Sequence, residues 1–144
     1  MEAVISYLHY LGFMTLFAAL VAQHLLFATE VSRAEAIRLA TLDGIAGIAA
    51  LLILVTGALK VFAVGTPAAV YAQNPFFHAK VTLFVVIALL SIIPTRDFLV
   101  ARKQARAATG DITLHLPRRI VMIQRIELLG VALLPLLAAC MVRL

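Results

Sequence analysis

The stretch AVISYLHYLGFMTLFAALVAQHLLFAT, residues 3–29, decides the fold, because it is apolar over a length that can cross a bilayer. It carries His9 near one end and His24 near the other. On a helix, a rise of roughly 22 Å and a net rotation of about 60° separate these side chains, so both face the same neighbouring helices. Ionisable groups at membrane depth are expensive to bury and usually have a function. We therefore predict that this segment carries part of the functional site.

The composition is that of an integral membrane protein. Of the 144 residues, 64% are hydrophobic and 13% are charged, and the mean hydropathy is +1.08. A soluble domain could not keep so much apolar surface away from water. The net charge of +5 does not indicate nucleic-acid binding, because most basic residues lie in the connections between apolar runs. The single cysteine, Cys140, argues against a disulfide framework and a cysteine-based metal site.

Four apolar runs predict one all-α transmembrane domain, residues 1–144, folded as an antiparallel bundle of four spanning helices. The expected spans are about 3–29, 44–64, 75–95 and 119–142. The continuity of the runs argues against β structure, because membrane strands alternate in polarity over about ten residues. We also expect short helical segments at the membrane interface.

Short motifs predict where two helices begin. Ser32 opens a capping-box pattern, which predicts a short interfacial helix over about residues 33–41 before the second span. Asn74 followed by Pro75 predicts the start of the third span, because Asn caps and Pro fits the first helical position. We expect the connection 65–73 to be irregular.

The Lys and Arg residues predict the orientation, because cytoplasmic loops carry the excess of positive charge. The first and third connections hold Arg33, Arg38, Arg96, Arg102, Lys103, Arg106, Arg118 and Arg119, against Lys60, Lys80 and Arg143 on the other side. We therefore expect both termini to face the periplasm of a bacterial inner membrane. His9 and His78 then lie towards the periplasmic face, and His24 lies towards the cytoplasmic one.

His9 and His78 form the strongest candidate pair. They come from different predicted helices, near the same face of the membrane, and each lies within about two turns of a helix start. One imidazole from each of two helices is what axial ligation of a haem b iron needs inside an apolar bundle. The alternative is that His9 belongs to an interfacial aromatic belt and His78 caps a helix end. We predict haem b bound through both histidines.

His78 and Lys80 cannot face the same site, because two residues turn a helix by about 200°. We predict that His78 faces the bundle and that Lys80 reaches the outer head groups, or a propionate or substrate carboxylate at the bundle edge.

The predicted cytoplasmic half also holds charged groups that need partners on other helices. The candidate pairs are His24 with Glu127, and Arg125 with Glu30 or Asp43. Such a cluster either fixes the register of the helices or forms a proton path or a second ligand site at His24. The structural alternative is favoured, because hydrogen bonds within the membrane can by themselves account for these groups.

Three motifs resemble those of the small four-helix membrane protoporphyrinogen oxidases of the HemJ group. They are Leu8-His9, Phe77-His78-Ala79-Lys80 and Arg125-Ile126-Glu127. The chain also resembles, over nearly its whole length, a family of small predicted bacterial membrane proteins with no assigned activity. The resemblance to the oxidases implies haem b, a dimer or trimer, and oxidation of a tetrapyrrole with electrons passed to a quinone.

The same resemblance implies catalytic roles for Lys80, Arg125 and Glu127. The sequence departs from the oxidases in two places. Their Asn-Glu-Val-Pro run is Ile-Glu-Leu-Leu here, residues 126–129, and residues 30–38 replace an acidic first loop with a trailing histidine. These departures affect the expected porphyrinogen substrate more than the expected haem.

Three functions follow as hypotheses for this lipid-embedded protein. The first is a haem b oxidoreductase or electron carrier. The second is a metal-ion transport or resistance component, similar to the copper-resistance inner-membrane proteins, in which His9 and His24 mark positions along one helix face. No Met cluster lies near these histidines, although copper(I) sites usually collect thioether ligands. The third is a non-catalytic structural subunit.

Overall fold

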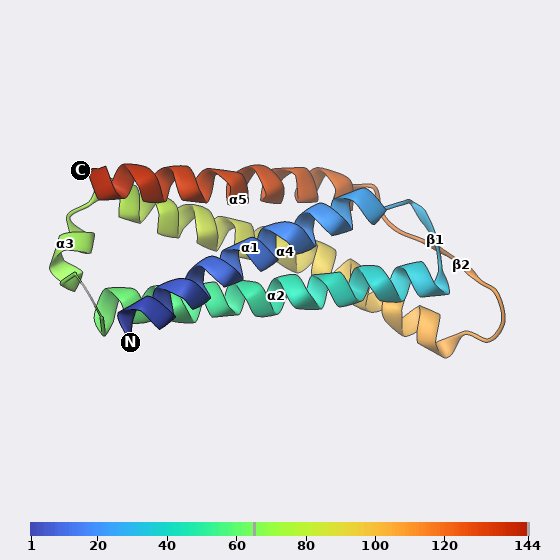
Figure 1. Ribbon diagram of the computed structural model, residues 1–144. Coiled ribbons are helices and arrows are strands. Elements are labelled where there is room, and N and C mark those ends of the chain that lie inside the picture. The colour runs from blue at the N-terminus through green and yellow to red at the C-terminus, as the bar shows by residue number, and fades with distance from the viewer. Residues whose placement is uncertain (65, 144) are drawn as a thin grey trace.

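Four long helices pack as an antiparallel bundle in a computed structural model that describes residues 1–64 and 66–143. They are α1 (Glu2–Leu26), α2 (Arg33–Phe62), α4 (Pro75–Ala107) and α5 (Arg119–Arg143) (Figure 1). Contacts run around a ring, in which α1 packs on α2, α2 on α4, α4 on α5 and α5 on α1. Both chain ends and the short helix α3 (Ala68–Ala72) lie at one end of the bundle, which we call the terminal end. The strands β1 (Glu30–Ser32) and β2 (Thr113–His115) lie at the other, the ribbon end.

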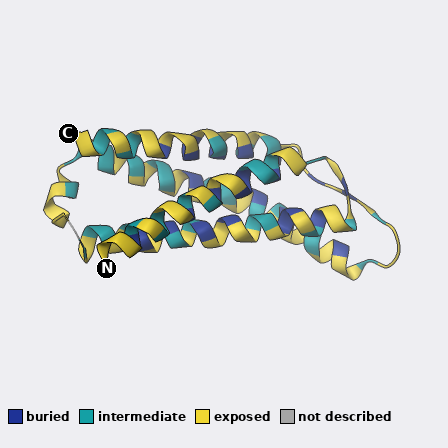
Figure 2. Ribbon diagram, viewed as in Figure 1, coloured by how far each residue is buried: buried dark blue, intermediate teal, exposed yellow. Residues whose placement is uncertain are grey.

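All four long helices are long and apolar enough to cross a membrane, which confirms the predicted fold class. The 30 residues of α2 and the 33 of α4 correspond to about 45 and 50 Å, more than the roughly 30 Å of a bilayer's hydrocarbon core. Buried residues face the bundle interior, and exposed ones cover its outside (Figure 2). Many of those exposed residues are large and apolar, among them Ile48, Leu89 and Leu129. Such a surface suits contact with lipid.

A two-stranded antiparallel ribbon closes one end of the bundle, contrary to the expectation of no β structure. Its central pair is Val31 with Leu114, and both residues are buried over the ends of α2 and α4. Leu116 N–H extends the ribbon by donating to the Thr29 carbonyl at 2.8 Å. Each strand has three residues, too few to show an alternating pattern in the sequence.

The predicted helix starts are confirmed. The Ser32 side chain accepts from Glu35 N–H at 3.3 Å, and the Glu35 carboxylate accepts from Ser32 N–H at 3.4 Å. The Asn74 side chain accepts from Phe76 N–H at 3.0 Å, with Pro75 at the first helical position. Residues 33–41 are helical but not a separate element, because α2 runs on without a break into the second span.

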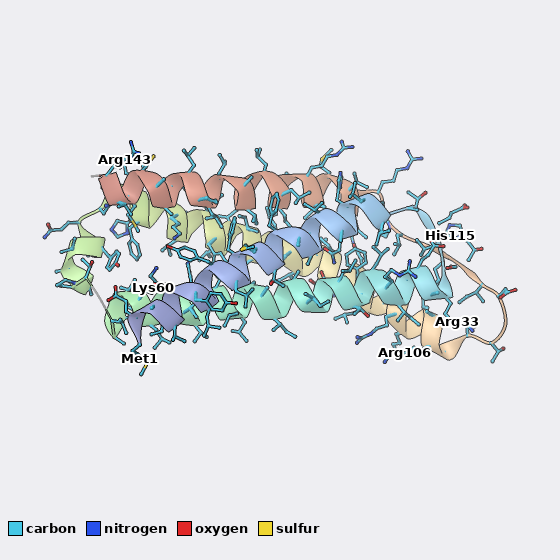
Figure 3. All side chains as sticks on the ribbon, in the orientation of Figure 1. Met1, Arg33, Lys60, Arg106, His115 and Arg143 are labelled. Atoms are coloured by element: carbon cyan, nitrogen blue, oxygen red, sulfur yellow. The ribbon has the colours of Figure 1, made fainter. Side chains whose placement is uncertain are left out.

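The two remaining connections also differ in detail from the expectation. Residues 68–72 form α3, so the described part of connection 65–73 is not wholly irregular, and Gly65 lies outside the described residues. At the ribbon end, α4 continues through Pro94 to Ala107. The Arg33 guanidinium, visible beside Arg106 in Figure 3, then holds the following loop by donating to the carbonyls of Ala108 at 2.7 Å and Gly110 at 2.6 Å.

Candidate functional site

His9 lies half-buried between α1 and α2, with Nδ1 2.9 Å from the hydroxyl oxygen of Thr56. That hydroxyl donates its own hydrogen to the Leu52 carbonyl at 2.6 Å. Because a hydroxyl has only one hydrogen, it must accept from His9, so Nδ1 carries a proton. The ring packs against Gly57, where an added Cβ would lie 3.4 Å from Cε1. In the neutral ring this tautomer leaves the lone pair on Nε2, the nitrogen that could bind a metal.

Two lysines lie near His9 at the terminal end. The Lys60 ammonium is 5.5 Å from the centre of the Tyr10 ring, a cation–π geometry (Figure 3 labels Lys60). Lys80 on α4 is half-buried, and the charges of both lysines act on His9. Whether Lys80 reaches the outer head groups or a carboxylate at the bundle edge stays a prediction.

His78 shows the opposite of its predicted direction. Its side chain is exposed, and Nε2 donates to the Ala72 carbonyl at 2.7 Å. That carbonyl belongs to the last residue of α3, the helix that the sequence did not predict. With its Nε2 hydrogen bonded there, His78 does not face His9, and it would have to leave Ala72 to ligate a shared iron through this atom. Haem ligation by this pair stays a prediction.

A second polar site lies nearer the ribbon end, between α2, α4 and α5. Glu127 on α5 is 2% exposed, and its Oε1 has no hydrogen-bond partner among the described residues. One turn earlier, Gln124 is fully buried, and neither its side-chain oxygen nor its nitrogen has a partner in that part of the chain. Buried polar atoms without partners are rare in proteins and call for an explanation.

Asp43 on α2 completes this site. The Gln23 amide of α1 donates to its carboxylate at 3.4 Å, and Thr95 on α4 lies within hydrogen-bonding reach. The carboxylates of Asp43 and Glu127 are close enough to interact electrostatically. Both line a cavity of about 260 Å³, which we call the acidic cavity. The polar residues that line it are Asp43, Ser91, Thr95, Arg102 and Glu127.

The acidic cavity offers oxygen ligands and an unbalanced charge. Asp43 and Glu127 bring two carboxylates, and Arg102 brings the one cationic side chain in the described lining. No ion pair within 4.0 Å joins Arg102 to either carboxylate in the described structure. If both carboxylates are ionised, the lining carries one net negative charge, which a proton or a single cation would neutralise. Carboxylate and hydroxyl oxygens suit hard cations rather than copper.

The predicted ion pairs of this half are not formed. Arg125 is exposed and contacts neither Glu30 nor Asp43 in the described ion pairs and hydrogen bonds. His24 has a buried Nδ1 without a partner among the described residues, rather than a bond to Glu127. Within residues 1–64 and 66–143, no three His, Cys, Asp or Glu side chains group closely enough to hold a metal ion.

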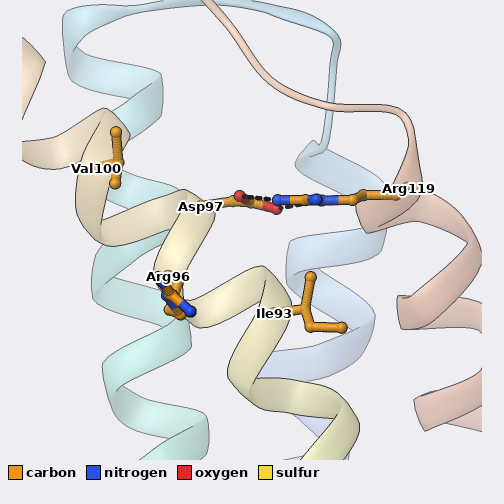
Figure 4. Close-up of a pocket in the computed structure, with 5 residues that line it drawn as sticks. All are labelled: Ile93, Arg96, Asp97, Val100 and Arg119. Carbon is orange, nitrogen blue, oxygen red and sulfur yellow. Dashed lines mark hydrogen bonds and ion pairs between the residues drawn. The ribbon is translucent and has the colours of Figure 1, made fainter.

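An ion pair of α5 is formed by Arg119 instead of Arg125. Arg119 at the start of α5 binds Asp97 of α4 through two hydrogen bonds, of 2.7 and 3.1 Å (Figure 4). The pair borders a second cavity, of about 390 Å³, whose lining also includes Ile93, Arg96 and Val100. Because Arg119 is largely exposed, we regard this contact as a link between α4 and α5 rather than a reactive site.

Sequence reasoning missed Asp43 and Thr95 as members of one site. Asp43 directly precedes the expected start of the second span at Gly44, so it was considered only as a partner for Arg125. A signal was present in Gln23, a polar residue within the first apolar run, because buried amides need partners on neighbouring helices. The position of Gln124, Arg125 and Glu127 in the first turns of the fourth span predicts burial of all three side chains; this is confirmed for Gln124 and Glu127 and wrong for Arg125, which is exposed.

Residues 1–143 match the family described as "Predicted membrane protein (DUF2214)", and the chain belongs to that family. The match agrees with the four candidate spans and covers nearly the entire bundle. No curated protein and no solved structure is significantly similar to the chain. The family description assigns no activity, and the resemblance to the HemJ oxidases stays a prediction.

Proposed function

We propose that this membrane protein binds a proton or a small hard cation at Asp43 and Glu127 and exchanges it across the membrane. It then acts as a transport protein or as one subunit of a transport system. The observation that carries the proposal is Glu127, a carboxylate 2% exposed within a spanning helix, with an unpaired oxygen and a second carboxylate across the same cavity. Intramembrane carboxylates that face a cavity are typical of proton and ion pathways.

Neighbouring side chains support this role over a structural one. A carboxylate that fixes helix register should be saturated with hydrogen bonds, because an unpaired buried polar atom costs stability. Gln23 instead donates to Asp43 at 3.4 Å, while Glu127 Oε1 has no hydrogen-bond partner among the described residues. The hydroxyls of Ser91 and Thr95 add neutral oxygen ligands to the two carboxylates.

The charge pattern supports an orientation for this transport. We place the ribbon end in the cytoplasm of a bacterial inner membrane and both termini in the periplasm, because Arg33, Arg102, Lys103 and Arg106 gather at the ribbon end. In that orientation, the acidic cavity lies in the cytoplasmic half of the bundle. Cysteine labelling of Glu2→Cys and Asp111→Cys, each combined with Cys140→Ala, tests the orientation in whole cells, since a membrane-impermeant reagent should modify only the first.

Flux measurements in liposomes test the transport. Wild-type protein is reconstituted with an internal pH dye, and a membrane potential is applied in sodium-free buffer for proton flux; radioactive sodium uptake is measured in parallel. We expect flux in one of these arms and its loss in Glu127→Gln and Asp43→Asn. Glu30→Gln, at an exposed carboxylate of the ribbon, is the matched control and should retain wild-type flux. Wild-type flux equal to that of empty liposomes, or undiminished flux in Glu127→Gln, would refute the proposal.

A second candidate is the haem b oxidoreductase, because His9 meets one requirement for it. Its Nδ1–H is bonded to Thr56, which leaves Nε2 as the potential ligand atom, the arrangement that orients metal-binding histidines. A bound haem would supply electron transfer to a partner such as a quinone, and Thr56 would hold the ring in place. Reduced-minus-oxidised spectra of the purified protein test this candidate. The haem b candidate requires that the wild-type spectrum shows a haem band and that this band is lost in His9→Ala. If the wild-type protein shows no haem band even after haem is added, the candidate is excluded.

The haem b oxidoreductase candidate also predicts an oligomeric state. A dimer or trimer is implied by the resemblance to the oxidases. The mass of the detergent-solubilised protein, measured by light scattering with the detergent contribution subtracted, separates these states from a monomer.

A further inference from the structure

The acidic cavity opens on the outside of the bundle, between α2 and α4. Its inner lining is buried and includes Leu16 of α1 and Glu127 of α5. Its outer lining is exposed and includes Gly44 and Gly47 of α2 and Ala88 of α4. The cavity therefore extends from the lipid-facing surface inward to Glu127.

Two glycines of α2, Gly44 and Gly47, line the opening. An added Cβ at Gly44 or Gly47 would meet no atom within 4 Å. At other places in the bundle, glycine accompanies close packing, as at Gly130, where an added Cβ would lie 2.6 Å from Ile87 Cδ1. The two exposed glycines therefore leave space that no neighbouring helix uses.

The chemistry of the lining is amphipathic. Apolar groups form most of the wall, with one aromatic ring, Phe84, on the α4 side and Ala50 on the α2 side. The carboxylates of Asp43 and Glu127 lie at its polar part, and Arg102 is the one positive side chain in the described lining. A ligand that complements this lining has an apolar body and one positive charge, because aromatic faces and carboxylates both attract cations.

We infer that the acidic cavity admits a hydrophobic monovalent cation sideways from the membrane, in competition with the proton or small cation for Asp43 and Glu127. The inference rests on the proposed function for its carboxylate site and adds the class of cargo, a quaternary ammonium or phosphonium compound. Exchange of such a cation for a proton leaves the net charge of the cavity unchanged. An uncharged amphiphile would leave the carboxylates without a counter-charge.

Binding of radiolabelled tetraphenylphosphonium to the purified full-length protein tests the inference. Wild-type protein should bind it saturably, and Glu127→Gln should weaken binding by at least about tenfold, because a buried charge pair is lost. Gly47→Leu should weaken it similarly by filling the opening with a side chain, and its fold should persist because leucine favours helix and an added Cβ at this position meets no atom within 4 Å. Ala58→Leu is the matched control, since this exposed alanine of α2 lies outside the cavity lining.

The flux assay separates this inference from the proposed function. Gly47→Leu keeps both carboxylates, so its phosphonium binding tests the opening, whereas flux of the wild-type protein tests the proposed function. Saturable binding that depends on Glu127 but without any wild-type flux would refute exchange across the membrane and support the cargo class. Wild-type binding no tighter than that of Glu127→Gln, or unchanged binding in Gly47→Leu, would refute the inference and leave the flux result standing.

Discussion

Two polar sites lie in one bundle of four helices, and they differ in whether their polar atoms have partners. At the terminal end, His9 donates to Thr56, and Thr56 donates to Leu52, so the chain of hydrogen bonds is complete. Nearer the ribbon end, Glu127 and Gln124 are 2% and 0% exposed and have polar atoms without a partner among the described residues. The first arrangement adds stability and joins α1 to α2. The second arrangement lowers stability, which indicates that these polar residues serve binding rather than packing.

Packing around Gly130 offers the largest test of this comparison. Gly130 follows Glu127 by one turn, and an added Cβ there would lie 2.6 Å from Ile87 Cδ1. Gly130→Leu should therefore lower the free energy of unfolding by about 3 kcal/mol, measured by SDS titration in mixed micelles, because overpacking displaces neighbours. The control Gly47→Leu should show no loss. Equal stability of both variants would mean that α4 and α5 are loosely packed, and the unpaired atoms would then need no functional explanation.

At Gln124, a substitution is expected to raise the free energy of unfolding rather than lower it. Its side chain is fully buried, and its amide oxygen and nitrogen have no partner in the described structure. Gln124→Leu should raise the free energy of unfolding by about 2 kcal/mol, because it removes two unsatisfied buried groups at similar volume. The same SDS titration measures it, with Gln104→Leu on the exposed part of α4 as the control. A destabilised Gln124→Leu variant would show that this amide has partners, and the contrast between the two sites would fail.

The comparison also explains which features of the structure could be predicted from the sequence. The spans follow from apolar length, and the starts of α2 and α4 follow from Ser32 and Asn74, because these signals are local. The direction of His78 depends on a carbonyl of α3, and the ribbon depends on pairing Val31 with Leu114, far apart in the sequence. Such contacts leave no trace in local pattern.

The acidic cavity was only partly predictable for the same reason. Burial of Glu127 was readable from its place in an apolar run, but its partner was not. Asp43, rather than the expected His24, shares the cavity with Glu127, because α2 begins at Arg33, eleven residues before the expected span start at Gly44, and carries Asp43 on a face towards α4 and α5. A pairing between helices depends on their relative rotation, which the apolar pattern of each helix fixes only coarsely.

The smallest expected change in the free energy of unfolding is at Thr56, and it tests the hydrogen-bonded site of His9 and Thr56. Thr56→Val keeps the shape of the side chain but removes the oxygen that accepts from His9 Nδ1 at 2.9 Å. The free energy of unfolding should fall by about 1 kcal/mol, the usual range for a hydrogen bond between membrane helices. Thr56→Ser, which keeps the acceptor, should recover most of that loss in the same titration.

Because the acidic cavity does not include Thr56, flux and phosphonium binding should stay at wild-type levels in both variants. Loss of flux in Thr56→Val with normal stability would instead make His9 part of the transport path, and the two sites would then differ in hydrogen bonding but share one function.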